Sequence, residues 1–526
     1  MRKTLGFLIL LWTSCLTAQA QLTLRIEDYA KLPITGSFTG AGNASSLARV
    51  NFFRTEPGPQ KRVFVNDLNG PLYILNKDTK TFSTYLNLNG RDSQPGLFDK
   101  FTFAAGFANG FVSFQFDPDY SKNGKFYTIH IEDPSVDGSL IPKNKNYRGL
   151  QVSDYRPTTS IQTPGTIARE GVLIEWTDSD ITNNTFEGTA RELLRIQLNT
   201  QIHPLADVVF NPAAHPGDAD WRVLYVGVGD GGSGERQNDI ARMNPQRLDT
   251  VVGKILRIIP DLEEHTESSR VSANGRYRIP NDNPFVQIDG AKAEIWSYGL
   301  RNPHRLVWDG DNLIAASVGL HTWEAIYLIH KGANYGYSER EGPELLLPNN
   351  NTTKRPDDDM IPIRITDKTT NGMVIPTYPV VAYDHTQGAA IAGGFIYHGR
   401  RIPSLRGKFV FGDIRNGKIW YCDFSEMVAA QQSKGQKLAE MHDMALEWHG
   451  KQYSTMADIV AAGYDSRQKE APGTPQRKAP DRPDIRLHVD EQGELYITSK
   501  VDGMIRAVIG AGVSNGGQNA FRGPDE

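Results

Sequence analysis

The stretch Val223-Leu-Tyr-Val-Gly-Val-Gly-Asp230 is a short apolar segment with an acidic residue at its end, and the same pattern returns along the chain. A near-continuous apolar run of this length is typical of a strand that is buried on both faces. Five further segments share an apolar core beside a polar or acidic residue, and they are residues 62–67, 125–131, 312–317, 408–413 and 494–499. A strand that recurs in this way predicts an all-β fold made of repeated units.

Three of these segments are followed by a tight turn and a second strand. The turns contain Asn69-Gly70, Asn416-Gly417 and Asp502-Gly503. Hairpin turns that match the twist of the strands need positive φ at their central residues, which Asn, Asp and Gly adopt at low cost. The repeated unit predicts a six-bladed β-propeller with long loops between its strands. For the strand pattern alone, a β-sandwich remains the alternative.

Residues from about 425 to 480 break the strand pattern. The part after Ser425 has the composition of a helix, and residues 469–478 form a polar, proline-containing stretch typical of a loop. We interpret residues 425–480 as a partly helical surface insertion. Because a propeller closes into one unit, residues 21–526 are expected to form a single domain.

The first twenty residues have the pattern of an export signal. Arg2 and Lys3 precede an apolar core, and Ala18-Gln-Ala20 supplies a small-x-small cleavage site. This predicts a signal peptide over residues 1–20, cleavage after Ala20, and a periplasmic or secreted protein. No later stretch approaches the roughly 20 apolar residues that span a bilayer, so we do not expect a membrane-embedded protein.

The composition excludes several classes of protein. A net charge of −4 provides no electrostatic footprint for nucleic acid. Of the two cysteines, Cys15 and Cys422, only Cys422 remains after cleavage, so no internal disulfide is expected. One cysteine cannot supply the C-x-x-C-H attachment of a c-type haem, and any electron acceptor would be a separate molecule. The glycine-rich residues 225–232 precede no helical pattern, which argues against a dinucleotide site.

Polar residues gather in loop-like segments beside strand ends, namely residues 202–212, 298–305, 317–337 and 379–415. Taken alone, His203 before Pro204 fits an ordinary loop histidine. Arg301 is compatible with a strand cap or with a pair to Asp309. Asp230 is compatible with an ion site, but acceptance of the amides of its own turn is the favoured interpretation.

Several motifs in these segments resemble the glucose/sorbosone dehydrogenase family. They are Gly299-Leu-Arg-Asn-Pro-His-Arg305, Lys331-Gly-Ala-Asn-Tyr-Gly-Tyr337, Gly393-Gly-Phe-Ile-Tyr397 and Phe411-Gly-Asp413, and the match runs in order from about residue 60 to 505. The family includes soluble PQQ glucose dehydrogenases, aldose sugar dehydrogenases and the propeller of hedgehog-interacting proteins. The resemblance implies a six-bladed propeller with PQQ and Ca²⁺ in its central depression. It also implies oxidation of an aldose or related alcohol by hydride transfer to PQQ, with electrons passed to a separate acceptor.

The resemblance also implies roles for particular residues. His203 falls at the position of the catalytic base, and a neutral imidazole suits proton abstraction near neutral pH. Arg301 and Asn302 match the pair that contacts PQQ, with Arg301 facing the quinone oxygen that becomes negative. The backbone carbonyls of Gly319 and Leu320 match those that hold the PQQ-bound calcium, an ion that prefers oxygen ligands.

Two further arginines are assigned to the cofactor by the same resemblance. Arg415 takes a position that lysine fills in the soluble glucose dehydrogenases, where the cation pairs with PQQ carboxylates. Arg486 lies near an arginine pair of these enzymes but is one residue out of register.

The sequence departs from the family at positions near the expected sugar site. Ala108 stands where sugar-oxidising relatives carry Gln or Glu, and Ile202 replaces an acidic residue before the histidine. Glu324-Ala325 replaces the Asp-Glu after the calcium loop. The sequence as a whole resembles the hedgehog-interacting-like branch more than the typical glucose dehydrogenases. Its cofactor site is better retained than its sugar site. The alternative function is therefore a non-catalytic propeller that binds a glycan or a protein on its top face.

Overall fold

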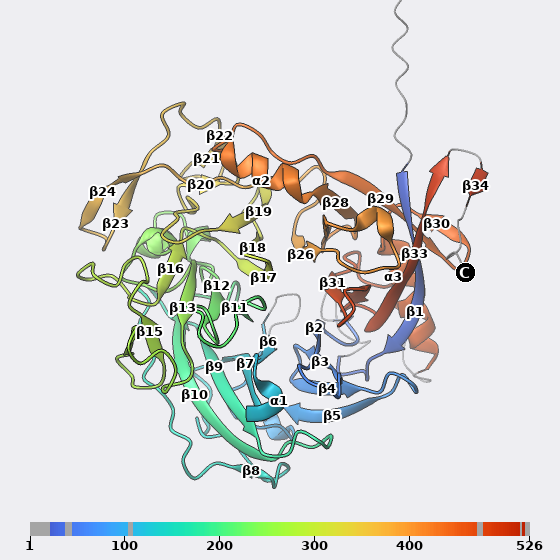
Figure 1. Cartoon of the computed structure of the whole chain (residues 1–526), viewed down its shortest axis with the longest axis horizontal. Helices are drawn as coiled ribbons and strands as arrows, with labels where there is room; N and C mark the ends of the chain where they lie inside the picture. The colour runs from blue at the N-terminus through green and yellow to red at the C-terminus, as the bar shows by residue number, and fades with distance from the viewer. Residues whose placement is uncertain (1–20, 37–44, 104–108, 471–476, 516–517, 521–526) are drawn as a thin grey trace, which may run out of the picture.

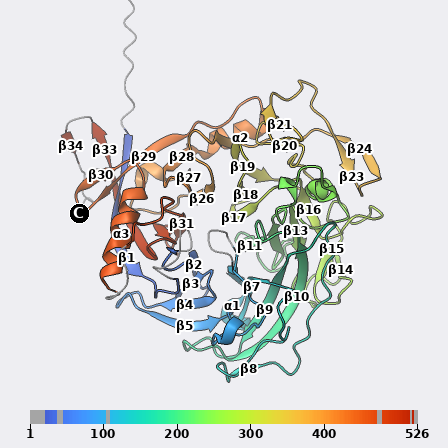
Figure 2. The ribbon, with the colours of Figure 1, turned by 180° about the vertical axis from the view of Figure 1, so that it is seen from behind.

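The computed structural model describes residues 21–36, 45–103, 109–470, 477–515 and 518–520. The predicted signal peptide and Ala108 lie outside the described residues. Strands make up most of the ordered elements, and Figures 1 and 2 show their sheets arranged in a ring around a common centre.

Four of the sheets are separate antiparallel runs in which each strand pairs with the next. They are β2–β3–β4–β5 (Val50–Thr55, Val63–Asp67, Pro71–Leu75, Phe82–Asn87); β6–β7–β9–β10 (Phe111–Phe116, Lys125–Glu132, Arg169–Asp178, Gly188–Leu198) with the short β8 (Leu150–Gln151); β11–β12–β13–β16 (Leu205–Phe210, Leu224–Val228, Lys254–Ile258, Ile295–Tyr298); and β17–β18–β19–β25 (Pro303–Asp309, Asn312–Ser317, Trp323–Ile329, Val381–Asp384). In both views the first strand of each run lies nearest the centre.

A larger sheet joins two further runs through the N-terminal strand. Its order is β26–β27–β28–β29–β1–β33–β32–β31, with bounds Ile391–Ile396, Lys408–Asp413, Ile419–Asp423, His442–Trp448, Gln21–Lys31, Met504–Asn515, Leu495–Ser499 and Ile485–Val489. Strands β30 (Lys451–Tyr453) and β34 (Gln518–Ala520) extend it at β29 and β33.

The remaining elements are small sheets and helices that lie outside these main sheets. The small sheets are β14–β15 (Ser269–Val271, Arg278–Pro280), β20–β21–β22 (Arg340–Glu341, Glu344–Leu346, Thr352–Thr353) and β23–β24 (Ile361–Arg364, Thr370–Val374). The α-helices are α1 (Tyr120–Asn123), α2 (Phe424–Gln432) and α3 (Ala457–Lys469), and the 3-10 helices are residues 91–93, 233–235, 240–246 and 403–405.

The strand predictions from the sequence are confirmed. The six apolar segments form β3, β7, β12, β18, β27 and β32, and each of these is the second strand of its run. The turns at Asn69-Gly70, Asn416-Gly417 and Asp502-Gly503 join β3 to β4, β27 to β28 and β32 to β33 as antiparallel hairpins. Nearly every residue of these second strands is buried, so both faces of each strand are covered, which explains the near-continuous apolar character.

The N-terminal strand closes the ring of sheets. Strand β1 pairs antiparallel with β33, where Leu24 faces Ala511, and parallel with β29, where Leu24 faces Leu446. Leu24 and Leu446 also belong to one buried cluster with Val508. The two ends of the described chain therefore stabilise the same sheet, as in a ring whose last sheet contains the first strand.

Residues 425–480 are more integral to the fold than the sequence indicated. Helices α2 and α3 agree with the predicted helical character, but β29 lies between them and pairs with both β28 and β1. Buried Met444, Leu446 and Trp448 carry an alternating apolar pattern on β29. This short alternation was hidden by the polar residues around it, so only the tertiary pairing identifies the strand.

The closure of the ring generates a first prediction. Leu24→Ala removes a fully buried side chain at the β29–β1–β33 junction, and we expect a loss of about 2–5 kcal/mol in the free energy of unfolding. Glu27→Ala, at an exposed position on the same strand, is the matched control, with a change expected within about 0.5 kcal/mol. Urea unfolding followed by circular dichroism measures both, and equal losses would contradict this account of closure.

Candidate functional site

Most of the predicted site residues lie at one edge of the sheets, which we call the site edge. In an antiparallel pair, the first strand begins where the second strand ends. The residues at this edge are His203 before β11, Arg301 and Asn302 before β17, Gly319 and Leu320 after β18, and Arg415 after β27. Arg486, the second residue of β31, lies close to the same edge.

His203 is held by a buried aspartate. Its Nδ1 lies 2.8 Å from Oδ1 of Asp230, which is fully buried at the end of β12. The backbone of His203 has a φ of 50°, and its carbonyl oxygen accepts a hydrogen bond of 2.9 Å from the amide of Gly231. The backbone hydrogen bond supports a left-handed conformation that non-glycine residues rarely adopt. The contact with Asp230 fixes the orientation of the imidazole ring.

Asp230 combines the role predicted for it with one that the sequence did not reveal. Its carboxylate accepts the amides of Gly232 and Gly234 at 2.8 and 3.0 Å, as expected for a turn. Burial raises the pKa of Asp230, but the charges of His203 and Arg301 outweigh this and hold it below its usual value. An ionised carboxylate only accepts hydrogen bonds, so Nδ1 of His203 carries a proton, and in the neutral form of the ring Nε2 is the acceptor.

Arg301 connects this pair to the predicted calcium loop. Its guanidinium donates to the carbonyl oxygens of Val318, at 3.3 Å, and Gly319, and it pairs with Glu235. The carbonyl of Arg301 accepts the amide of Asp230 at 2.7 Å. The alternative partner Asp309 lies at the far end of β17 and pairs with His398 instead. Arg301 is therefore a buried cation between the His203–Asp230 pair and residue 319.

A second histidine–carboxylate pair lies beside the same loop. Glu324 is fully buried, and its Oε1 contacts Nε2 of His385 at 3.0 Å and the amide of Gly319 at 3.3 Å. Its Oε2 accepts the amide of Ile391 at 2.8 Å. The hydrogen bond with Glu324 raises the pKa of His385. The sequence left His385 unassigned, because its partner is 61 residues away and no local spacing relates them.

Arg486 belongs to a cluster with an excess of positive charge. It donates to Oδ1 of Asp484 at 2.9 Å. Burial raises the pKa of Asp484, but the surrounding basic residues hold it far below its usual value, and they are Lys500, Arg482, Arg486 and Arg49. Burial and the charge of Arg486 also lower the pKa of Lys500 well below its usual value. Such a cluster is suited to an anionic ligand.

The two arginines assigned to the cofactor differ in their surroundings. Arg486 is buried, and its charge helps to lower the pKa of His304 on β17, where burial is the larger cause. The side chain of Arg415 is exposed, and its guanidinium forms no hydrogen bond or ion pair with the described residues. Its turn nevertheless adjoins the Arg486 segment, because the amide of Asp484 donates to the carbonyl of Ile414 at 3.1 Å.

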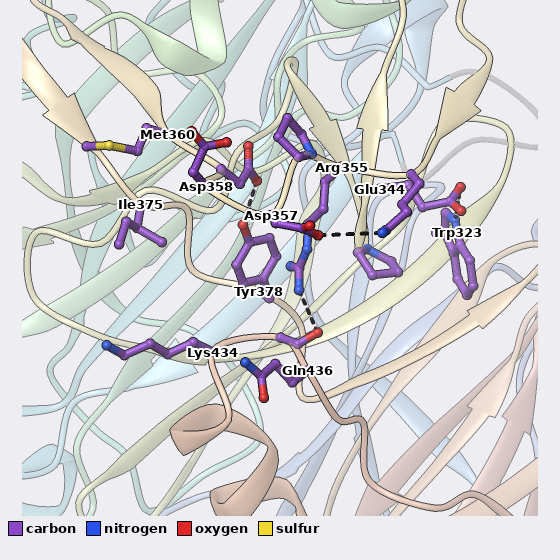
Figure 3. A pocket seen from close by; sticks show the side chains of 15 residues that line it. Trp323, Glu344, Arg355, Asp357, Asp358, Met360, Ile375, Tyr378, Lys434 and Gln436 are labelled. Carbon is purple, nitrogen blue, oxygen red and sulfur yellow. Dashed lines mark hydrogen bonds and ion pairs between the residues drawn. The ribbon is translucent and has the colours of Figure 1, made fainter.

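A cavity of about 880 Å³ lies next to the calcium loop and shares Trp323 with it (Figure 3). Nε1 of Trp323 donates to Glu344 at 3.0 Å. Across the cavity, Arg355 lies over the ring of Tyr378 at 3.6 Å from its centroid. No local pattern in the sequence indicates this cavity, since its walls come from β19, β21, the segments before β25 and the loop after α2.

The described residues contain no group of three or more His, Cys, Asp or Glu side chains arranged to hold a metal ion. None of the helices in the described part of the chain combines the length and apolarity needed to cross a bilayer.

Comparison with solved structures defines the fold class. The soluble aldose sugar dehydrogenase of Escherichia coli, in its apo form, superposes with a TM-score of 0.52 at 15% identity, covering 94% of this chain and 99% of that one. The PQQ-bound aldose sugar dehydrogenase of Streptomyces coelicolor gives a TM-score of 0.50 at 14% identity, covering 93% and 98%. The chain thus has the mainly β fold of these sugar dehydrogenase structures.

Sequence comparisons support the family resemblance. Residues 215–453 match the family model described as Glucose / Sorbosone dehydrogenase, and the resemblance inferred from the motifs is confirmed. The HIPL1 protein of Arabidopsis thaliana is 26% identical over 399 residues, which cover 72% of this chain and 52% of that protein. The aldose sugar dehydrogenase YliI of Escherichia coli is 35% identical over 98 residues, 18% of this chain and 22% of that one. The chain spans about half the length of the HIPL relatives that it matches.

The His385–Glu324 pair generates a pH-dependent prediction. Because the folded state raises the pKa of His385, the pair stabilises the fold fully below the unfolded value of about 6.5. That contribution is lost as the pH rises through the folded value. His385→Gln should therefore lower the free energy of unfolding more at pH 5.5 than at pH 9, by about 1 kcal/mol or less.

Urea unfolding at the two pH values measures this difference. His215→Gln changes an exposed histidine and is the control, with the same small effect expected at both pH values. A His385→Gln penalty that grows with rising pH would contradict the prediction.

Proposed function

We propose that the chain is an exported, single-domain, six-bladed β-propeller dehydrogenase that oxidises an aldose or related alcohol with PQQ and Ca²⁺. The observation that carries the proposal is the His203–Asp230 pair beside the buried cation Arg301 at the site edge. The four separate runs and the two runs joined in the larger sheet support the blade count. The signal-peptide pattern supports a periplasmic or secreted location.

The residues at the site edge fit an anionic cofactor with several carboxylates. Nε of Arg301 and Nε of Arg486 are buried donors without a hydrogen-bond partner within the described residues, and Oδ1 of Asn302 is a buried acceptor in the same state. The two arginine donors suit carboxylates, whereas the Asn302 oxygen suits a ligand group that donates. Leaving such an atom unpaired costs about 1–3 kcal/mol, so a polar ligand that pairs with them would bind favourably. Arg301, Asn302 and Arg486 would hold PQQ, and the exposed Arg415 is free to reach its carboxylates.

The backbone after β18 fits the calcium ion expected beside PQQ. Gly319 and Leu320 would supply carbonyl oxygens, which are suitable ligands for this hard cation. The Gly319 carbonyl already faces a cationic group, because it accepts a hydrogen bond from Arg301. A glycine is required at 319, since an added Cβ would lie 1.5 Å from the carbonyl oxygen of Trp323.

The side chains of the site divide the chemistry of alcohol oxidation between them. When bound, PQQ would supply the quinone that accepts the hydride, and calcium would polarise the quinone carbonyl. Nε2 of His203 accepts the proton of the substrate hydroxyl, because Asp230 holds the other ring nitrogen as the donor. The ionised Asp230 then stabilises the imidazolium that forms. Arg301, buried and charged, stabilises negative charge that develops near it.

The first experiment is a titration of the purified chain with PQQ and Ca²⁺, with dye reduction measured against a panel of aldoses and polyols. We expect activity that needs both additives. His203→Gln should reduce the rate by about 100- to 10,000-fold, since it removes the general base, while an absorbance titration shows PQQ binding unchanged. His215→Gln changes an exposed histidine that follows the opposite end of β11, and it is the control.

Two outcomes would contradict the enzyme proposal. If PQQ does not bind even with Ca²⁺ present, the assignment of the cofactor is wrong. If PQQ binds but no sugar or alcohol is oxidised, the departures at Ala108 and Ile202 would explain the loss of the sugar site. The alternative then is a propeller that binds a glycan or protein at this face without turnover.

A further inference from the structure

Glu341, at the end of β20, holds the loop that follows β18. Its Oε1 accepts hydrogen bonds from the backbone amides of four consecutive residues, namely Leu320, His321 and Thr322 at 2.8 Å and Trp323 at 3.0 Å. The side chain is buried, with 2% of its residue surface exposed. Four consecutive backbone amides are therefore anchored to one buried carboxylate oxygen.

This arrangement fixes the direction of two carbonyl groups. A trans peptide unit is planar, with its N–H and C=O groups pointing in opposite directions. The amides of Leu320 and His321 share their peptide units with the carbonyls of Gly319 and Leu320. Because both amides point at Glu341, both carbonyls point away from it. The Gly319 carbonyl indeed accepts a hydrogen bond from Arg301, on the side of the His203–Asp230 pair.

The second carboxylate oxygen of Glu341 has no hydrogen-bond partner among the described residues. Oε2 of Glu341, Nε of Arg301 and the hydroxyl of Tyr337 are buried and lack hydrogen-bond partners among the described residues. The same three residues line a cavity of about 20 Å³. The negative charge of Glu341 therefore lies directly behind the loop, where it polarises the peptide units and makes their outward carbonyl oxygens more negative.

We propose that Glu341 is a positioning residue that presents the carbonyl oxygens of Gly319 and Leu320 to a cation and thereby sets the affinity of the site edge for Ca²⁺. This inference rests on the proposed function, because the cation is the one expected beside PQQ. It adds a residue that touches neither the cation nor the cofactor and acts through the backbone of its neighbours. Outer groups of this kind typically change metal affinity about ten- to a hundredfold.

The test measures metal dependence rather than turnover. Purified apo-protein is mixed with a fixed PQQ concentration, and Ca²⁺ is titrated while PQQ binding is followed by quenching of protein fluorescence. Glu341→Gln keeps an acceptor oxygen and the side-chain shape but removes the charge. We expect its Ca²⁺ half-saturation to rise about tenfold or more, with PQQ affinity at saturating Ca²⁺ unchanged.

Glu344→Gln is the matched control, because Glu344 also contacts Trp323 but through the indole Nε1 and not through a backbone amide. Its Ca²⁺ half-saturation should equal that of the unmodified chain. If Glu341→Gln does not fold, Glu341→Asp is the second variant, because it keeps the charge and withdraws it from the amides. A smaller rise in Ca²⁺ half-saturation, about threefold, is then expected.

The outcomes separate this inference from the proposed function. An unmodified chain that binds no PQQ at any Ca²⁺ concentration would overturn the proposed function and this inference with it. An unmodified chain that binds PQQ in a Ca²⁺-dependent way, together with a folded Glu341→Gln variant of unchanged half-saturation, would overturn the role of Glu341 alone. Equal shifts in Glu341→Gln and Glu344→Gln would also overturn it, because they would indicate a general loosening around Trp323.

Discussion

Buried carboxylates that accept backbone amides are the interaction on which the site edge depends. Asp230 accepts two amides of its turn, Glu341 accepts four, and Glu324 accepts those of Gly319 and Ile391. Asp413 accepts the amides of residues 389, 390, 415 and 416. A buried carboxylate without such donors would be costly, so each of these loops is folded around its acid.

These carboxylates also join separate parts of the proposed site. A path of hydrogen bonds runs from His203 to Asp230, through Arg301 to Gly319, and on to the Glu324–His385 pair. The proposed base and the proposed calcium loop are therefore one buried network. Changes at its members are expected to be coupled rather than additive, because they share partners in a region of low dielectric.

The closure of the ring of sheets positions the site residues relative to one another. The site edge collects residues from His203 to Arg486, which lie on different sheets. Their relative positions depend on the strand pairing that joins β1 to β29 and β33. A rigid ring is a suitable support for such a site, because residues on packed sheets keep their positions better than residues on loops alone.

The sequence by itself determined the second strand of each run and three hairpin turns, because apolar runs and Asn-Gly or Asp-Gly pairs act locally. Motif order was also sufficient to show the family resemblance and to single out His203, Arg301 and Gly319 as candidates. Only the tertiary structure decided that β29 belongs to a sheet, that His203 pairs with Asp230, and that Glu341 holds residues 320–323. The physical reason is that these contacts join segments from about 20 to more than 400 residues apart. Their proximity depends on how the sheets and loops pack, and no local pattern records it.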